Sequence, residues 1–554
     1  MRPLLCFLAC SLAASAQTLP RILSQELDRN FSVLKQKGDP PPYFMAYAVT
    51  DEETEVISST LGVLQSKNKS HARYLDITIR VGSPKLDNYH VIRGQRARFT
   101  PGSALAVDDV PAALRQRIWL ETDRTYRLAA QRLIEIKSNS QTRVAEKDQS
   151  DDFSAEEPSV YEETVPRLPI AEEEWTKRLR SWSAELAKYP AVLNSSVSLI
   201  VRRETRYLIT TEGTRLQHGR TFTTIAISAQ GKASDGMDLG ASQNFQGRDW
   251  DGLPKPPEIL ASVNKVGADL SALLKAPVVE PYIGPAILSG SASGVFFHEI
   301  FGHRIEGHRQ RDESEGQTFT ASVGSSVLPD FLSVVFDPTR EKIGAVDLNG
   351  TYGYDDEGVK ARPLTLVENG ILKSFLMSRS PVKGFEHSNG HGRRQPGAEI
   401  VSRQSNLIVQ SKKQVTDAEL RRMLILEVKR IGKPYGLYFQ EVSSGFTTTS
   451  RRGLQAFSVI PLLVYRVYPD GRPDELVRGA DIVGTPLASF AKILATSDKA
   501  EVFNGTCGAE SGWVPVSAVS PALLVSEIEI QKKDQSQDRP PLLPRPFGDG
   551  EAAR

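Results

Sequence analysis

The sequence predicts an α+β fold in two domains, an N-terminal antiparallel sheet with helices followed by a mostly β domain. Three observations support this prediction. The chain has 554 residues, too many for a single hydrophobic core. Its N-terminal half alternates helix-like and strand-like periodicity. After about residue 276, short β-rich pieces are separated by glycines.

The composition is that of an ordinary globular protein with almost no net charge. Hydrophobic residues make up 40% and charged residues 24%, and the formal charge is 68 − 67 = +1. A polybasic nucleic-acid binder is excluded on this balance, so we expect no nucleic acid among the partners.

The first residues have the pattern of a signal peptide. Arg2 precedes an apolar run at 4–14, and Ala14-Ser15-Ala16 is a small-x-small cleavage pattern. We therefore predict a signal peptide at 1–16 and an exported protein, periplasmic or secreted. This run is too short to span a bilayer, and no later stretch reaches the roughly 18 uncharged apolar residues that a membrane helix needs, so no transmembrane segment is expected.

The N-terminal domain is predicted to span 17–275. Helical spacing of apolar residues predicts helices, and alternation predicts strands. The expected helices lie at 22–37, 110–136, 171–188 and 254–274, and the expected strands at 43–50, 55–65, 72–81 and within 191–233. Turns are expected at 51–53 and 67–69. The acidic stretch 145–166 is predicted to be a mobile surface segment because it has few aliphatic residues.

The C-terminal domain is predicted to span 276–531. The expected strands lie at 331–337, 361–368, 371–378, 436–442, 455–468 and 523–530. Asn369-Gly370 between two of these runs predicts a two-residue hairpin turn. The proline-rich end at 532–554 is predicted to be a disordered tail.

One thiol remains after removal of the signal peptide. Cys6 and Cys10 lie within 1–16, which leaves Cys507 alone and excludes an internal disulfide in the mature chain. A lone thiol in an exported protein is expected either to be buried as a small apolar residue or to serve as a metal ligand or nucleophile.

Two histidines and a glutamate suggest a hydrolytic metal site. His298 and His303 are five positions apart, and Glu299 directly follows the first of them. Neutral imidazoles are common zinc ligands, and a nearby carboxylate can accept a proton from water at the metal. In a regular helix, however, residues i and i+5 lie about 140° apart around the axis. A zinc site therefore requires a distortion, either a π-type bulge or a helix that ends and turns at Gly302.

A catalytic zinc needs a third protein ligand, and Cys507 is the candidate because thiolate and imidazole both suit zinc. The C-terminal domain would then be a mostly β domain carrying a metal-binding helix. Two incidental helix histidines remain an alternative. His308 is expected to be a surface residue, and Glu306 is a candidate to orient a histidine ligand.

Several motifs together resemble the TldD/PmbA family of peptidases. The stretch from His298 to Gly307 resembles the family's H-E-x-x-G-H-x-x-E-G. The further resemblances follow in the same order: D-D-E-G at 355–358, E-N-G-x-L at 368–372, N-G-R-R within 389–394, G-T-C-G at 505–508 and V-P-V at 514–516. They cover about 280–530, whereas 17–275 agrees only in the order of its elements.

The resemblance implies a TldD-like, metal-bearing member. His298, His303 and Cys507 would bind Zn²⁺, and Glu299 would be the general base. Family members form dimers whose enclosed chamber admits unfolded peptide, so a homodimer or a heterodimer with a metal-free homologue is expected. This chain has His308 where the family often has Asp, and the segment 145–166 has no counterpart.

The function that follows is a zinc-dependent peptidase that hydrolyses amide bonds of unfolded peptides. Two other functions stay open at this point. The chain could be a non-catalytic scaffold subunit of the same fold, or a cysteine hydrolase with Cys507 as nucleophile and a histidine as base.

Overall fold

The computed structural model describes residues 18–92, 94–140, 148–451, 457–484, 489–533, 541 and 543. The predicted signal peptide at 1–16 and most of the predicted tail at 532–554 lie outside the described residues. Among the helices that are described, none is long and apolar enough to cross a membrane.

The N-terminal part of the chain folds into one large sheet with helices. Its helices are α1 (Leu19–Lys37), α2 (Pro111–Ser140), α3 (Glu172–Glu185), η1 (Leu186–Lys188, 3-10) and α4 (Pro256–Leu273). Its strands are β1 (Pro42–Thr60), β2 (Val63–Ser83), β3 (Leu86–Asp87), β4 (Ser103–Leu105), β5 (Val160–Glu162), β6 (Asn194–Thr210), β7 (Arg215–Lys232) and β8 (Asp238–Gly247). The order is β3-β2-β1-β6-β7-β5, with β4 beside β2 and β8 beside β7.

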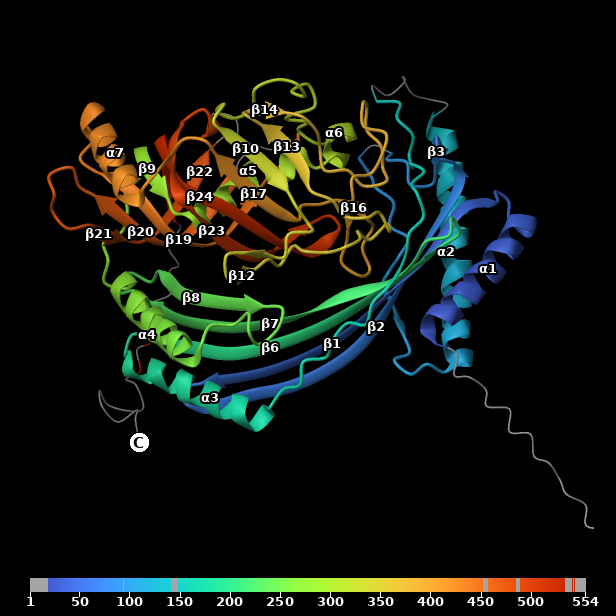
Figure 1. The fold of residues 1–554 in the computed structure, drawn as a ribbon, viewed down its shortest axis with the longest axis horizontal. Helices are drawn as coiled ribbons and strands as arrows, with labels where there is room; N and C mark the ends of the chain where they lie inside the picture. Colours follow the sequence, from blue (N-terminus) through green and yellow to red (C-terminus); the bar gives the residue numbers. More distant parts are fainter. Residues whose placement is uncertain are drawn as a thin grey trace, which may run out of the picture.

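The long strands form a curved sheet, and the C-terminal domain lies against its concave face (Figure 1). Helices α1 and α2 cover one end of the opposite face, and α3 and α4 cover the other end. Each helix pair has its own apolar core: one cluster joins α1 and α2 to β1 and β2, and another joins α3 and α4 to the strands around β6 to β8. All four predicted helices are present, because their apolar faces have a sheet to cover.

The two turns predicted at 51–53 and 67–69 are wrong. Strands β1 and β2 run through both positions and turn instead at Leu61-Gly62, where φ is 47° and 85°. Positive φ at both central residues is the type I′ geometry that suits a hairpin. The acidic residues at 51–53 stay extended because neighbouring strands supply cations: Asp51 pairs with Arg73 at 2.6 Å, and Glu53 with Arg203 at 2.9 Å.

The acidic stretch 145–166 differs from its prediction only in part. Residues 152–154 are buried between the domains, whereas most of 155–164 is exposed as predicted, including β5, which pairs in parallel with β7. Asp152 and Phe153 are both 5% exposed rather than on the surface. Asp152 pairs with Arg311 at 2.9 Å, and the guanidinium groups of Arg80 and Arg379 each lie 3.9 Å from the Phe153 ring. Charge pairing thus compensates for the low aliphatic content of this stretch.

The C-terminal domain is mostly β. Its helices are α5 (Gly290–Ile300), η2 (Gly302–Ile305, 3-10), α6 (His308–Arg311) and α7 (Asp417–Arg430). Its strands are β9 (Tyr282–Leu288), β10 (Leu332–Phe336), β11 (Lys342–Ile343), β12 (Val346–Asp347), β13 (Leu364–Glu368), β14 (Ile371–Leu372), β15 (Gly392–Arg393), β16 (Val401–Ser402), β17 (Asn406–Ser411), β18 (Gln414–Val415), β19 (Gly436–Thr447), β20 (Phe457–Val467), β21 (Glu475–Val477), β22 (Ala480–Gly484), β23 (Ile493–Ala509) and β24 (Gly512–Lys532).

The main C-terminal sheet has the order β14-β13-β10-β17-β24-β22-β20-β19-β9. Because β9 pairs with both β19 and β24, these strands and β20 and β22 close a ring. The predicted hairpin at Asn369-Gly370 is confirmed, with φ of 49° and 80°. Helix α5 packs against β24, β19 and β23, and its aromatic residues belong to the largest core cluster. This packing holds the segment that contains the two histidines.

Candidate metal centre

A helix that ends early brings the two histidines together. The Ser289 side chain caps α5 by accepting from Ala292 N at 3.2 Å, and α5 ends at Ile300. The tighter 3-10 helix η2 begins at Gly302, so the predicted distortion of the helix at this glycine is confirmed. A Cβ at position 302 would lie 1.9 Å from Gln404 Oε1, and Gln404 donates to His298 O at 3.2 Å. Any other residue at position 302 would displace the Gln404 side chain.

Strand β23 brings Cys507 to the same place. Its Sγ lies 3.2 Å from His298 Nε2 and 3.3 Å from His303 Nε2. The three candidate donor atoms all lie within 4.8 Å of one another, and all three side chains are buried. The structure therefore brings together the three residues that the sequence singled out as ligands.

The spacing of these atoms fits a tetrahedral zinc ion. Zinc bonds of about 2.3 Å to sulfur and 2.0–2.1 Å to nitrogen place sulfur and nitrogen ligands about 3.5 Å apart at a tetrahedral angle. The observed separations of 3.2 and 3.3 Å are close to this value. The donor set, two imidazoles and a thiol, is one that zinc accepts.

Glu299 adds a carboxylate beside the three donors. Its Oε2 lies 4.0 Å from His303 Nε2, and the residue is 6% exposed. Burial raises the pKa of this carboxyl, although the neighbouring imidazoles act in the opposite direction. The backbone of β19 passes so close that a Cβ on Gly445 would lie 2.6 Å from Glu299 Cγ. The carboxylate is thus confined next to the donors.

The buried carboxylate of Glu306 contacts His303 on the side of the ring away from Cys507. Glu306 is fully buried and lies 3.4 Å from His303 Nδ1, on the ring nitrogen opposite Cys507. It also accepts from Arg309 Nε at 2.8 Å. Arg403 lies 3.6 Å from Glu306 and donates to Cys507 O at 2.7 Å. Such carboxylate contacts fix the tautomer and orientation of metal-binding histidines, as expected for Glu306.

The electrostatics of the site favour a thiolate. Burial raises the pKa of Cys507, but the two imidazoles outweigh it and hold that pKa well below its usual range. Burial lowers the pKa of His303, yet Cys507 and Glu306 together raise it well above the ordinary value. Glu306 itself has a pKa of about 2, because His303 and Arg309 outweigh its burial. A deprotonated sulfur is what a metal ligand or a nucleophile requires.

The prediction that His308 is a surface residue is wrong. Its side chain is 4% exposed, and its Nε2 lies 2.6 Å from Glu510 Oε1. No sequence pattern pointed to Glu510, which lies in a turn three positions after Cys507, or to Arg304, Arg403 and Gln404. These residues act through contacts between distant segments, which no local pattern reveals.

Comparison with known proteins supports the family assignment. Residues 281–532 match the model of the PmbA/TldA metallopeptidase C-terminal domain. A metalloprotease TldD homolog of Haemophilus influenzae is 28% identical over 349 residues, which cover 61% of this chain and 68% of that protein. A zinc metalloprotease TldD homolog of Saccharolobus solfataricus is 32% identical over 95 residues, or 17% of this chain and 20% of that protein.

The fold agrees with that of a solved structure over nearly the whole chain. The crystal structure of TldE from Thermococcus kodakarensis superposes with a TM-score of 0.60 at 14% identity, covering 91% of this chain and 100% of that one. Its similarity extends to the N-terminal sheet, where the sequence resemblance was confined to element order. The matched C-terminal domain, the ordered motifs and the relatives named TldD support the assignment of this chain to the TldD/PmbA family, and the superposition supports the fold.

Proposed function

We propose that this protein is a zinc-dependent peptidase that hydrolyses amide bonds of unfolded peptides. His298, His303 and Cys507 would hold the ion, and Glu299 would be the general base. The observation that carries the proposal is the convergence of three buried donor atoms within 4.8 Å, with a carboxylate 4.0 Å from one of the imidazoles. A relative of this chain is named a zinc metalloprotease.

When bound, zinc would supply Lewis-acid polarisation of the scissile carbonyl and would lower the pKa of water. Glu299 would accept the proton of the attacking water and pass it to the leaving amine. Its pKa, raised by burial, moves toward neutral pH, which suits both proton transfers. Glu306 would keep His303 oriented, and Gly445 would leave room for the Glu299 side chain. A non-catalytic scaffold would need none of this arrangement around Glu299.

The test uses the purified full-length chain and an unfolded peptide substrate. We expect about one zinc per chain in the purified protein, loss of hydrolysis after removal of the metal by a chelator, and recovery on addition of zinc. The matched substrate control is a folded protein that contains the same peptide sequence, and it should not be cleaved. Hydrolysis that survives complete removal of zinc would contradict the proposal.

The second candidate is a cysteine hydrolase, favoured by the low pKa of Cys507 between two imidazoles at 3.2 and 3.3 Å. Zinc content of the Cys507→Ala variant separates the two. A zinc peptidase loses the ion and its activity together. A cysteine hydrolase loses activity, but its metal content does not change.

The partners and the compartment are further parts of the proposal. We propose a homodimer or a heterodimer with a metal-free homologue, on the strength of the family resemblance, and light scattering of the purified chain with and without such a homologue tests it. Export rests on the pattern at 1–16. N-terminal sequencing of protein isolated from the native cell should begin at Gln17.

A further inference from the structure

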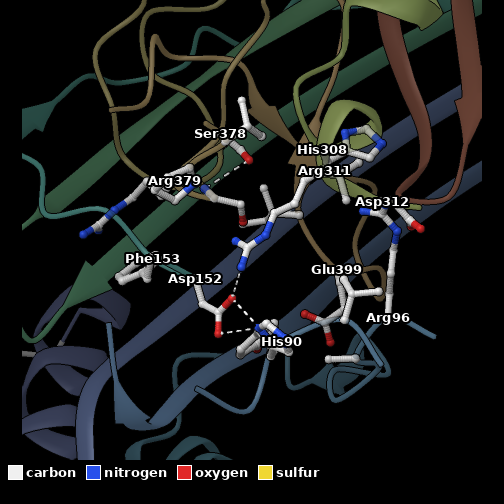
Figure 2. A pocket seen from close by; sticks show the side chains of 18 of the residues that line it. His90, Arg96, Asp152, Phe153, His308, Arg311, Asp312, Ser378, Arg379 and Glu399 are labelled. Carbon is white, nitrogen blue, oxygen red and sulfur yellow. Dashed lines mark hydrogen bonds and ion pairs between the residues drawn. The ribbon is translucent and has the colours of Figure 1, made fainter. Parts of the chain in front are cut away.

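A large cavity lies between the two domains. Its volume is about 670 Å³, and its walls come from the concave face of the N-terminal sheet and from the C-terminal segment that follows η2 (Figure 2). Several charged groups on these walls are paired with each other. Asp152 pairs with Arg311 at 2.9 Å, and Arg96 pairs with Asp312 at 3.0 Å. Cations that already have an anion beside them are poor candidates to attract a charged ligand.

Two arginines elsewhere on the domain boundary have no such partner. Arg220 lies on β7 of the N-terminal sheet, and Arg393 lies on β15 of the C-terminal domain and is only 7% exposed. In the described part of the chain neither guanidinium forms an ion pair with a carboxylate. Their neighbour Arg206, by contrast, pairs with both Glu204 and Asp356. A cation taken out of water without an anion costs free energy.

Each of the two arginines uses one terminal nitrogen to contact the protein. Arg220 Nη1 donates to Asn349 O at 2.7 Å and to Asn349 Oδ1 at 3.1 Å. Arg393 Nη1 donates to Gln404 O at 2.6 Å and to Pro515 O at 2.8 Å. Among the described residues, Nε and Nη2 of both arginines have no hydrogen-bond partner, and unlike several other arginine Nε atoms they are not enclosed by protein. These nitrogens can therefore reach a ligand.

The two arginines approach the same hairpin from different domains. Asn349, which accepts from Arg220, donates its Nδ2 to Gly505 O at 2.9 Å. Arg393 donates to Pro515 O at 2.8 Å. Gly505 and Pro515 lie on adjacent rungs of the ladder between β23 and β24. The hairpin thus holds the two guanidinium groups in one neighbourhood.

The electrostatics show that these cations lack an anion. Burial lowers the pKa of Arg220 to about 10, and repulsion from Arg206 and Arg393 acts in the same direction. Burial also lowers the pKa of Arg393, together with repulsion from Arg206 and Arg403. Nearby acidic groups oppose both shifts without outweighing them. An anion bound between the two arginines would favour the charged form of each.

We propose that Arg220 and Arg393 form a binding site for an oxyanion group, a carboxylate or a phosphate, at the boundary between the domains. The planar fork of a guanidinium matches two oxygens of such a group, and two forks from different domains bind it together. A neutral ligand would leave both charges uncompensated, and a cation would be repelled. The group can come from a free inorganic anion or from the C-terminal carboxylate of a peptide. The inference does not rest on the proposed peptidase function.

The binding test uses the full-length chain, both loaded with zinc and freed of zinc by a chelator that is then dialysed away. Inorganic phosphate is titrated by calorimetry in a buffer without other oxyanions. A short unfolded peptide with a free C-terminal carboxylate is titrated into the zinc-free chain, beside the same peptide with a C-terminal amide. We expect saturable binding of phosphate, of the carboxylate peptide but not its amide, or of both, and the probe that binds identifies the source of the oxyanion.

The variants assign the binding to the two arginines. Arg393→Gln and Arg220→Gln should each raise the Kd at least about tenfold, because hydrogen bonds to a charged group are lost. Arg393→Lys keeps the charge but not the planar fork, so it should recover only part of the affinity. Arg203→Gln is the matched control, since Arg203 belongs to the same sheet but already pairs with Glu53 at 2.9 Å. Its Kd should equal that of the wild-type chain.

Thermal unfolding gives a second readout. An anion that binds only the folded chain raises Tm, so the probe that binds should raise the Tm of the wild-type chain and of Arg203→Gln but not that of Arg220→Gln or Arg393→Gln. Because the two arginines lie in different domains, one variant stays informative if the other fails to fold.

Three outcomes would overturn the proposal. One is a folded Arg220→Gln or Arg393→Gln variant that binds the probe as tightly as the wild-type chain. Another is the absence of saturable binding of phosphate and of peptide up to about 10 mM. The third is phosphate binding that disappears with zinc and persists in the arginine variants, which would place the anion at the metal. None of these results decides whether the chain hydrolyses peptides, because the zinc assay tests that separately.

Discussion

Two groups of side chains in the described part of the chain have donor atoms close enough to share one ion. One is His298, His303 and Cys507, and the other is Asp51, Glu53 and His71 on the strands β1 and β2. In the second group Asp51 already pairs with Arg73 at 2.6 Å, and Glu53 with Arg203 at 2.9 Å.

At the candidate metal centre the arginines bond to carbonyl oxygens instead. Arg403 donates to Cys507 O, and Arg304 donates to Glu299 O, so the sulfur, the imidazoles and the Glu299 carboxylate keep their own charge or lone pairs. The comparison teaches that closeness of donors does not make a metal site. What matters is whether neighbouring cations have already neutralised them.

The largest effect is expected from removing a donor at the candidate metal centre. His298→Ala should lower zinc affinity by more than about 100-fold, because losing a residue that only orients a ligand already costs about 10–100-fold. Peptide hydrolysis should be lost with the metal. Elemental analysis after dialysis and a peptide assay measure both. Full zinc occupancy in this variant would show that His298, His303 and Cys507 do not form the zinc site.

Glu299→Gln should separate metal binding from chemistry. We expect kcat to fall by about 10²–10⁴, the usual contribution of a general base, with zinc content unchanged. Zinc analysis and steady-state kinetics on the same preparation test this. A variant that keeps most of its kcat would show that another group accepts the proton.

Glu306→Gln should weaken zinc binding by about 10–100-fold, because the carboxylate orients His303 through Nδ1. Glu315→Gln is the matched control, since Glu315 also pairs with Arg309, at 2.9 Å, but is not among the contacts of His303. Competition with a chelator of known affinity gives both constants. Equal affinities in the two variants would mean that Glu306 serves only to balance Arg309.

The pH dependence of hydrolysis should reflect the raised pKa of Glu299. The base acts only when deprotonated, so kcat/KM should fall about tenfold per pH unit below that pKa. Because burial raises it, the decline should begin above the ordinary glutamate value of 4.5. Zinc content is measured in the same buffers, so that loss of metal is not mistaken for protonation. A flat profile down to pH 4.5 would exclude Glu299 as the base.

The smallest effect is expected at the second group. His71→Ala should leave zinc content and hydrolysis unchanged and should alter the free energy of unfolding by less than about 1 kcal/mol, since His71 is a partly exposed partner of Asp51. Chemical denaturation and elemental analysis suffice. Loss of zinc here would show that this group binds metal despite its arginines.

Local patterns predicted the helices and much of the strand content well, because an amphipathic face of 15 or more residues repeats its signal many times. They failed at 51–53, where cross-strand arginines keep acidic residues extended. They also failed at 152–153, which two arginines and a neighbouring loop bury. In each case the deciding partner is distant in the chain.

The same division holds at the candidate site. The residue types and the need for a break at Gly302 follow from the sequence alone, because ligand chemistry and helix geometry are local properties. That Cys507 lies beside His303, 204 positions away, is decided by the packing of α5 against β23. The burial of His308 is decided in the same way: it contacts Glu510, 202 positions away, and it lines the cavity between the domains. Such long-range contacts have no counterpart in a local pattern.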